Sequence, residues 1–193
     1  KLHPTSGAKI KVVSVGSNPR HLSINAAGTE LYASRFITPP IPGEATANVK
    51  TTVGNIKYGG KVVKIKTATM AVNKRIVLEH SERQDSEHSG RGIPNYLGPL
   101  IISPDGLSGW VPSKQDNIKR GMLRDGNNLT HDSTIRSITS RINLASGIED
   151  TDARVDHDNG GIASSGVFGR YGIYLYVALE GSREVAVLDA LNK

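Results

Sequence analysis

The chain repeats one pattern three times: an apolar run, a glycine, and a second run that opens with an aromatic residue. The segments read HLSINAAGTELYAS, LGPLIISPDGLSGWVPS and SGVFGRYGIYLYVAL, and they align without gaps. Their shared positions are the glycines Gly28, Gly106 and Gly172, the apolar residues Ile24, Ile102 and Phe168, and the aromatics Tyr32, Trp110 and Tyr176. Two such runs joined by a tight turn are typical of a β-hairpin. The repeat predicts successive hairpins with these apolar and aromatic side chains buried at equivalent places.

Shorter alternating runs predict the remaining strands. They lie at residues 9–15, 61–67, 74–79, 134–144 and 184–189. Together with the hairpins they predict an all-β protein of about three four-stranded antiparallel sheets. The corresponding units span residues 9–79, 92–147 and 159–193 of a single segment.

Composition narrows the function classes. The 193 residues include no cysteine, which excludes disulfides, thiol catalysis, cysteine-ligated zinc and thioether-attached haem within the chain. No run approaches the roughly 18 apolar residues of a membrane helix. The net charge of +6 comes from Lys and Arg residues spread along the chain, so nucleic-acid binding is not expected. The chain begins at Lys1, and we expect a processed or partial segment.

Four motifs carry a resemblance to a known repeat. They are Val15-Gly16-Ser17-Asn18-Pro19, Ser103-Pro104-Asp105-Gly106, Leu175-Tyr176-Val177-Ala178 and Val185-Ala186-Val187-Leu188-Asp189. Their order resembles the YVTN-type β-propeller repeat, although Arg170-Tyr171-Gly172 replaces its Pro-Asp-Gly. The resemblance implies β-propeller blades. Since propellers have four to eight blades, it also implies further blades or self-association of chains.

A second resemblance concerns the stretch GRGIPNYLGPLIISPDGLSGWVPSKQDNIKRG. It is similar to propeller regions of bacterial secreted proteins that accompany cytochrome-c-peroxidase-like domains. This likeness implies a periplasmic or extracellular location. The chain lacks a Cys-x-x-Cys-His haem motif, so any haem domain would lie outside it.

Two polar clusters are candidate metal sites. His80, Glu82 and His88 place imidazole and carboxylate groups close together in the sequence, as transition metals require. Their spacing matches no zinc motif, and a solvated loop is the alternative. Asp156, Asp158 and Asn159 offer hard oxygens at short spacing, as in half of a calcium loop. The rest of a calcium loop is missing, so we expect a hydrogen-bonded turn and no cofactor.

A third polar segment is a candidate for binding a ligand or partner. It comprises Lys114, Gln115, Asp116, Asn117, Lys119, Arg120 and Arg124. Loops at one end of a propeller can surround the central channel, and basic groups and amides there could hold an anion or an acidic partner surface. The alternative is an exposed loop of mixed charge.

These observations predict a non-catalytic binding or scaffold module that presents its loops to a partner protein or domain. No Gly-x-Ser-x-Gly nucleophile elbow is present in the sequence. Repeats with long polar insertions and no catalytic motif favour binding over catalysis. Two alternatives stay open: an enzyme, either a lactonase-like hydrolase or the accessory propeller of a haem peroxidase, and a structural array protein of the cell surface.

Overall fold

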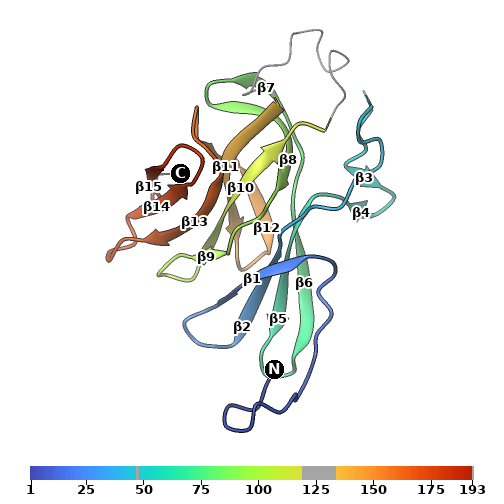
Figure 1. Ribbon diagram of the computed structural model, residues 1–193, viewed down its shortest axis with the longest axis vertical. Coiled ribbons are helices and arrows are strands. Elements are labelled where there is room, and N and C mark those ends of the chain that lie inside the picture. Colours follow the sequence, from blue (N-terminus) through green and yellow to red (C-terminus); the bar gives the residue numbers. More distant parts are fainter. Residues whose placement is uncertain (47, 119–133, 193) are drawn as a thin grey trace.

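The first of the chain's β-sheets has four antiparallel strands. The computed structural model describes residues 1–46, 48–118 and 134–192. Sheet 1 runs in the order β1-β2-β5-β6, with bounds β1 (Pro19–Ile24), β2 (Glu30–Arg35), β5 (Gly60–Lys66) and β6 (Ala71–Leu78). A separate two-stranded ribbon, β3 (Thr52–Val53) and β4 (Ile56–Lys57), interrupts the connection from β2 to β5. In Figure 1 this ribbon stands away from sheet 1.

Sheet 2 is the largest, with the order β12-β11-β10-β8-β7 and β9 beside β10. Its strands are β7 (Ser81–Ser86), β8 (Ser89–Asn95), β9 (Ile101–Ile102), β10 (Ser108–Asp116), β11 (Ile135–Asn143) and β12 (Ile148–Asp156). Strands β8 and β9 pair with opposite ends of β10. They therefore act as one interrupted strand, while β7 extends the sheet as a hairpin with β8.

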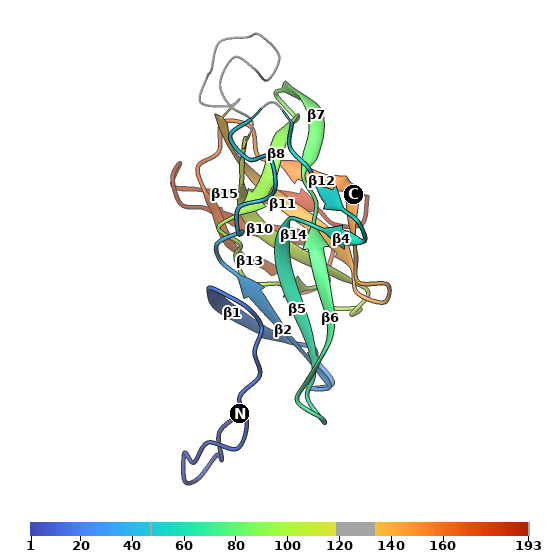
Figure 2. The ribbon, with the colours of Figure 1, turned by 90° about the vertical axis from the view of Figure 1, so that its right-hand side faces the viewer.

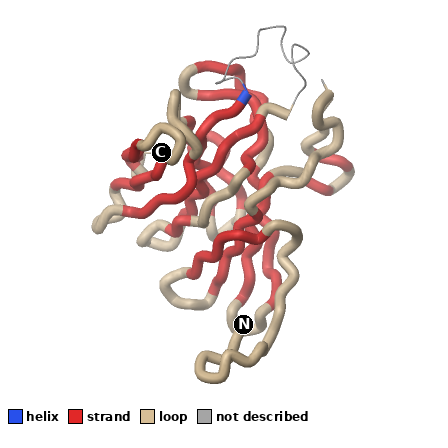
Figure 3. The backbone as a smooth tube through the Cα atoms, in the orientation of Figure 1, coloured by secondary structure: helices blue, strands red, loops and turns tan. Residues whose placement is uncertain are grey.

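Sheet 3 has three strands in the order β13-β14-β15. Their bounds are β13 (Ala163–Phe168), β14 (Tyr174–Leu179) and β15 (Glu184–Asp189). All fifteen named elements of the described residues are strands (red in Figure 3), and helical geometry within the described ranges is confined to residue 134 (blue). No helix within the described ranges is long and apolar enough to cross a bilayer.

The three glycine turns have one geometry. Gly28, Gly106 and Gly172 all adopt a left-handed backbone, with φ between 69° and 72°, which glycine tolerates without steric cost. Each glycine N–H donates to the carbonyl three residues earlier, at 2.9, 2.8 and 2.9 Å. The turns join β1 to β2, β9 to β10 and β13 to β14. The predicted hairpins and their repetition are thus confirmed.

Two apolar cores lie between the sheets. The first joins sheets 1 and 2, and comprises Tyr32, Val62, Ile76, Leu78, Leu97, Leu100, Val111, Ile142 and Leu144. The second joins sheets 2 and 3, and comprises Trp110, Ala163, Leu175, Val177, Leu179 and Leu188. Burying these side chains supplies the main drive to stack the sheets. Stacked antiparallel sheets of one repeat make the chain an all-β, partial β-propeller.

Some expectations about burial were wrong. Ile24 is 57% exposed and Tyr176 is 38% exposed, because no sheet covers the faces on which they lie. Tyr32 and Trp110 are buried as predicted, while Ile102 and Phe168 are partly buried against the two cores.

Some expectations about strands were also wrong. Residues 9–15 form no strand and make only an isolated bridge at Lys9. In Figure 2 this N-terminal segment (dark blue) runs apart from the sheets. The polar segment that holds His80 and His88 belongs largely to the β7–β8 hairpin instead of a loop. Strand β12 was not predicted from the sequence, because its apolar residues Ile148, Ala153 and Val155 do not alternate regularly with polar ones.

Candidate functional site

The long insertions leave the sheets at one end. Strands β2 and β10 run toward that end and β5 and β11 run back from it, so the connection between β2 and β5 begins and ends there, and residues 117–118 and 134 also lie there. The β7–β8 hairpin follows β6 at the same end, at the top of Figure 1. We call this the insertion end. The glycine turns lie at the opposite end, which we call the turn end. The long connections, which differ from one another in length and sequence, therefore lie on one side of the sheets.

A buried ion pair anchors the insertion end. Arg154 Nη2 lies 2.6 Å from Glu149 Oε1, and both side chains are almost fully buried. Arg154 also donates to Gln115 Oε1 at 3.0 Å and to the Glu79 carbonyl at 2.7 Å. Glu149 Oε2 in turn accepts the Glu79 N–H at 2.6 Å. The network ties β12 and β10 of sheet 2 to the end of β6 in sheet 1.

Gln115 was predicted as a ligand-binding residue, and the structure places it inside the molecule. Its side chain is buried, accepts from Arg154 and donates to the Gly90 carbonyl at 2.9 Å. Alternate residues of a strand point to opposite faces, so Gln115 and its neighbours Lys114 and Asp116 point to different sides. The three polar residues therefore do not form one binding surface.

Lys114 and Asp116 belong to a stacked cluster between sheets 1 and 2. Lys114 Nζ lies 4.1 Å from the centroid of the Tyr96 ring and 2.8 Å from Asp116 Oδ1. Tyr96 stacks on Phe36 with ring centroids 4.6 Å apart, and the Arg20 guanidinium lies 4.0 Å over Phe36. Each ring is held between a cation and the other ring, which favours both contacts. Asp116 also accepts from Asn95 Nδ2 at 2.7 Å.

The remaining candidates of this segment are at its far end. The Asn117 N–H donates to the Thr134 carbonyl at 2.9 Å, which closes the long connection at its base. Lys119, Arg120 and Arg124 lie outside the residues that the structure describes.

Asp156 of the candidate calcium turn is held by an arginine. Asp156 Oδ2 lies 2.7 Å from Arg136 Nη1, and only 6% of either side chain is exposed. Burial raises the pKa of Asp156 above its ordinary value, although the Arg136 hydrogen bond opposes the shift. Arg136 also donates to the Ser86 carbonyl. The pair therefore links β11 and β12 to the β7–β8 hairpin.

Asp158 and Asn159 form the turn after β12. Asn159 Nδ2 donates to Asp158 Oδ2 at 3.1 Å, and Asn159 adopts a left-handed backbone with φ of 53°. Asp158 is exposed.

The first metal candidates are spread along the β7–β8 hairpin and its base. His80 is a buried ring 3.4 Å from Glu82 Oε1, whereas His88 lies at the hairpin tip. His88 and Asp156, from two separate sequence clusters, line one small cavity with Arg154. In the described ranges, no three His, Asp or Glu side chains converge as metal ligands would.

His157 is a buried polar residue that no pattern in the sequence predicts. Its ring is buried, and Nε2 lies 2.8 Å from the Thr139 hydroxyl. Burial lowers its pKa to about 4, so the folded protein holds it neutral at physiological pH. The apolar residues around position 157 gave no periodic signal that would have predicted this burial.

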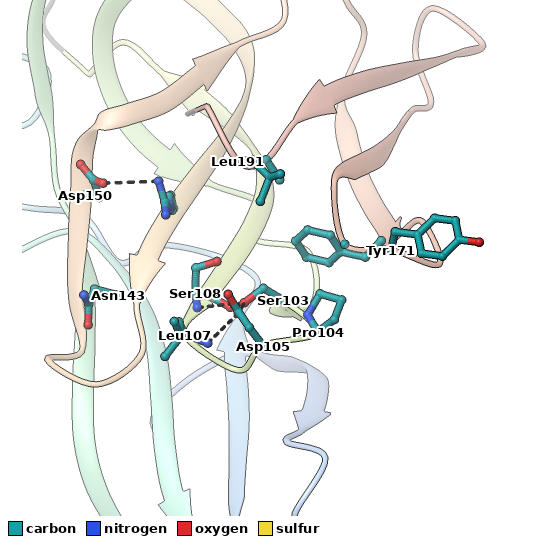
Figure 4. Close-up of a pocket in the computed structure, with 13 residues that line it drawn as sticks. Ser103, Pro104, Asp105, Leu107, Ser108, Asn143, Asp150, Tyr171 and Leu191 are labelled. Atoms are coloured by element: carbon teal, nitrogen blue, oxygen red, sulfur yellow. Dashed lines mark hydrogen bonds and ion pairs between the residues drawn. The ribbon is translucent and has the colours of Figure 1, made fainter.

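A groove of about 640 Å³ lies at the turn end, between sheets 2 and 3. Figure 4 shows Ser103, Asp105 and Ser108 on one side and Tyr171 on the other. Asp105 Oδ1 accepts from Ser103 Oγ at 2.5 Å and from the Leu107 N–H at 2.9 Å. These bonds lower the pKa of Asp105. The hydrogen bonds of Asp105 thus stabilise the hairpin turn. Arg141 and Asp150 form an ion pair in the groove, with a loose contact of 3.9 Å between Arg141 Nη1 and Asp150 Oδ2.

Comparison with known proteins supports the fold alone. No protein-family profile and no curated protein sequence matches the chain. Among solved structures, hydrazine synthase of Kuenenia stuttgartiensis is similar over 97% of this chain and 45% of its own, with a TM-score of 0.64 and 16% identity. A putative 6-phosphogluconolactonase from Bacteroides fragilis is similar over 92% of this chain and 36% of its own, with a TM-score of 0.48 and 17% identity. The chain spans less than half of either protein.

Proposed function

We propose that the chain is a non-catalytic β-propeller module that binds a partner protein or domain through its insertion end. The observation that carries this proposal is the arrangement of the insertions. The connection that holds the β3–β4 ribbon and the β7–β8 hairpin of sheet 2 extend from the stacked sheets on the same side, where residues 117–118 and 134 also lie. Binding residues are commonly placed on loops that a rigid scaffold positions.

The state of the polar groups at this end also favours binding over catalysis. Glu149, Arg154, Gln115, Arg136 and Asp156 make bonds within the protein that fix the bases of the insertions. Groups that hold a scaffold together are not available for general acid–base chemistry, which needs contact with a reacting atom. The exposed tips of the insertions are then the surface that a partner would meet. Periplasmic or extracellular placement stays part of this proposal.

The experiment compares matched variants of the two ends. One variant replaces the β3–β4 ribbon, residues 51–58, with a short Gly-Ser linker. A second carries Glu87→Lys and His88→Ala at the exposed tip of the β7–β8 hairpin. The control carries Leu107→Lys and Tyr171→Ala at exposed positions of the turn end. All three should keep the parent's circular dichroism spectrum, because none removes a buried side chain.

The readout is quantitative cross-linking of the purified chain to proteins of its source extract. We expect the insertion-end variants to lose the cross-linked protein that the parent captures, and the turn-end control to retain it. Loss in the control with retention in both insertion variants would contradict the proposal. Hydrolysis of 6-phosphogluconolactone or glucono-δ-lactone by the parent chain would instead favour the hydrolase alternative.

A further inference from the structure

Sheet 3 leaves one face uncovered. Val167, Tyr176 and Val187 lie directly opposite one another on β13, β14 and β15, and opposed residues of an antiparallel sheet share a face. All three are exposed, as are Tyr174 and Val185 beside them. We call these five residues the sheet 3 open face. Large contiguous apolar patches are uncommon on monomeric proteins and mark interaction sites.

The repeat identifies what such a face contacts. Tyr32, Trp110 and Tyr176 occupy the same place in their units, four residues after the turn glycine. Tyr32 is 1% exposed and packs against Leu97 and Leu100 of the next unit. Trp110 is 0% exposed and packs against Leu175 and Val177 of sheet 3. Only Tyr176, which has no following sheet beside it, is 38% exposed. This position therefore contacts the next sheet of the repeat.

Sheet 1 presents the complementary face. The residues that flank the repeat aromatic point toward the preceding sheet. Val111, which follows Trp110, belongs to the same core as Tyr32 of sheet 1. Leu175 and Val177, which flank Tyr176, belong to the same core as Trp110 of sheet 2. Their equivalents in sheet 1 are Leu31 and Ala33, opposite Ile24 and Leu22 of β1. Ile24 and Leu22 are exposed. Leu31 is half-buried and Ala33 is buried, so we call Leu22, Ile24 and Leu31 the sheet 1 open face.

We propose that the sheet 3 open face of one chain binds the sheet 1 open face of a second copy. Each contact would continue the packing already present between sheets 1 and 2 and between sheets 2 and 3. Two copies joined head to tail through two such contacts form a ring of six sheets, within the four to eight of known propellers. A heterologous contact of this kind closes when its rotation fits. This inference is independent of the partner proposed for the insertion end.

Light scattering coupled to gel filtration measures the assembly directly. We expect the parent chain at tens of micromolar to have twice the monomer mass. Val187→Lys and Ile24→Lys should each give a monomer with an unchanged circular dichroism spectrum, because both side chains are exposed within the chain. The control Leu107→Lys, at an exposed position of a glycine turn, should keep the parent's mass.

Mixing the two monomeric variants tests which faces meet. The Val187→Lys chain retains an intact sheet 1 open face, and the Ile24→Lys chain retains an intact sheet 3 open face. We expect the mixture to recover a dimer through one contact, since the proposed interface is heterologous. An interface of one face with itself would not recover.

Disulfide trapping gives the same test covalently, because the chain has no native cysteine. We expect Tyr176→Cys and Ile24→Cys chains, mixed under mild oxidation, to cross-link with each other, and a Leu107→Cys control to cross-link with neither. A parent chain that stays monomeric would overturn the proposal. So would a dimer that survives both lysine variants, or a series of larger assemblies in place of a closed pair.

Discussion

Trp110 is the side chain on which the second core depends most. It is the only tryptophan of the chain, it is fully buried, and it lies where sheets 2 and 3 meet. Trp110→Ala should lower the free energy of unfolding by about 3–5 kcal/mol, because it removes a large buried ring and leaves a cavity. A urea melt followed by circular dichroism measures this. Tyr171→Ala, at a highly exposed ring, serves as the control and should change stability by less than about 0.5 kcal/mol.

His157 makes stability depend on pH. Burial lowers its pKa from 6.5 to about 4 in the folded protein, so the unfolded chain binds this proton more readily. Its contribution is fully present above pH 6.5 and is lost as pH falls toward 4, at about 1.4 kcal/mol per pH unit. Urea melts at several pH values should show this slope in the parent. His157→Gln should flatten that part of the profile, whereas His3→Gln, at an exposed site, should not.

Calcium is expected to leave the protein unchanged. Asp156 is paired with Arg136, and Asp158 shares a hydrogen bond with Asn159, so the turn is held together without an ion. A ligand that binds only the folded state would raise its stability by about 2.7 kcal/mol at a hundredfold excess over its dissociation constant. We predict no shift in melting temperature with excess calcium. A shift in the parent that is absent in Asp158→Asn would reveal a real site.

At the scale of the elements, the sequence predicts the hairpins well and the site poorly, for physical reasons. A turn glycine and its flanking apolar residues are local signals, so the Gly28, Gly106 and Gly172 turns could be read from the chain. The partners of Gln115 and Asp156 are Arg154 and Arg136, which lie on other strands. No local pattern states which arginine a carboxylate or amide will meet after folding.

The β7–β8 hairpin and strand β12 show the limit of the hydrophobic pattern itself. Their sequences, SERQDS and IEDTDARVD, are largely polar. Strand β12 is paired with β11, and its buried residues include Glu149, whose charge is met by Arg154. Burial that rests on an ion pair cannot be recognised from apolar periodicity.

The Glu149–Arg154 pair gives a prediction for this element. Glu149→Gln should destabilise the protein by about 3–5 kcal/mol, because it leaves a buried guanidinium without its countercharge. The double variant Glu149→Leu with Arg154→Met should be more stable than Glu149→Leu alone or Arg154→Met alone, since no buried charge is left unpaired. Urea melts of the parent, these two single variants and the double variant form the double-mutant cycle. Additive effects of the two changes would mean that the pair does not interact.

At the scale of the whole molecule, stacking decides where function can reside. Sheets of one repeat, packed through two cores, direct short turns to one end and long insertions to the other. The turn end varies little because each glycine turn has the same geometry. The insertion end differs from unit to unit, which is what a binding surface requires. A binding role for this end therefore requires the β3–β4 ribbon and the β7–β8 hairpin to lie on the same side of the sheets.

Distances between spin labels test this arrangement most directly, and the absence of native cysteine allows labels to be placed at will. One double-cysteine variant carries Glu87→Cys in the β7–β8 tip and Asn55→Cys in the β3–β4 turn. A second carries Glu87→Cys and Ala68→Cys in the β5–β6 turn, at the bottom of Figure 1. Pulsed electron–electron double resonance should give a clearly shorter distance for the first pair than for the second (Figure 1). The reverse order would contradict the account, because the two insertions would then lie at opposite ends.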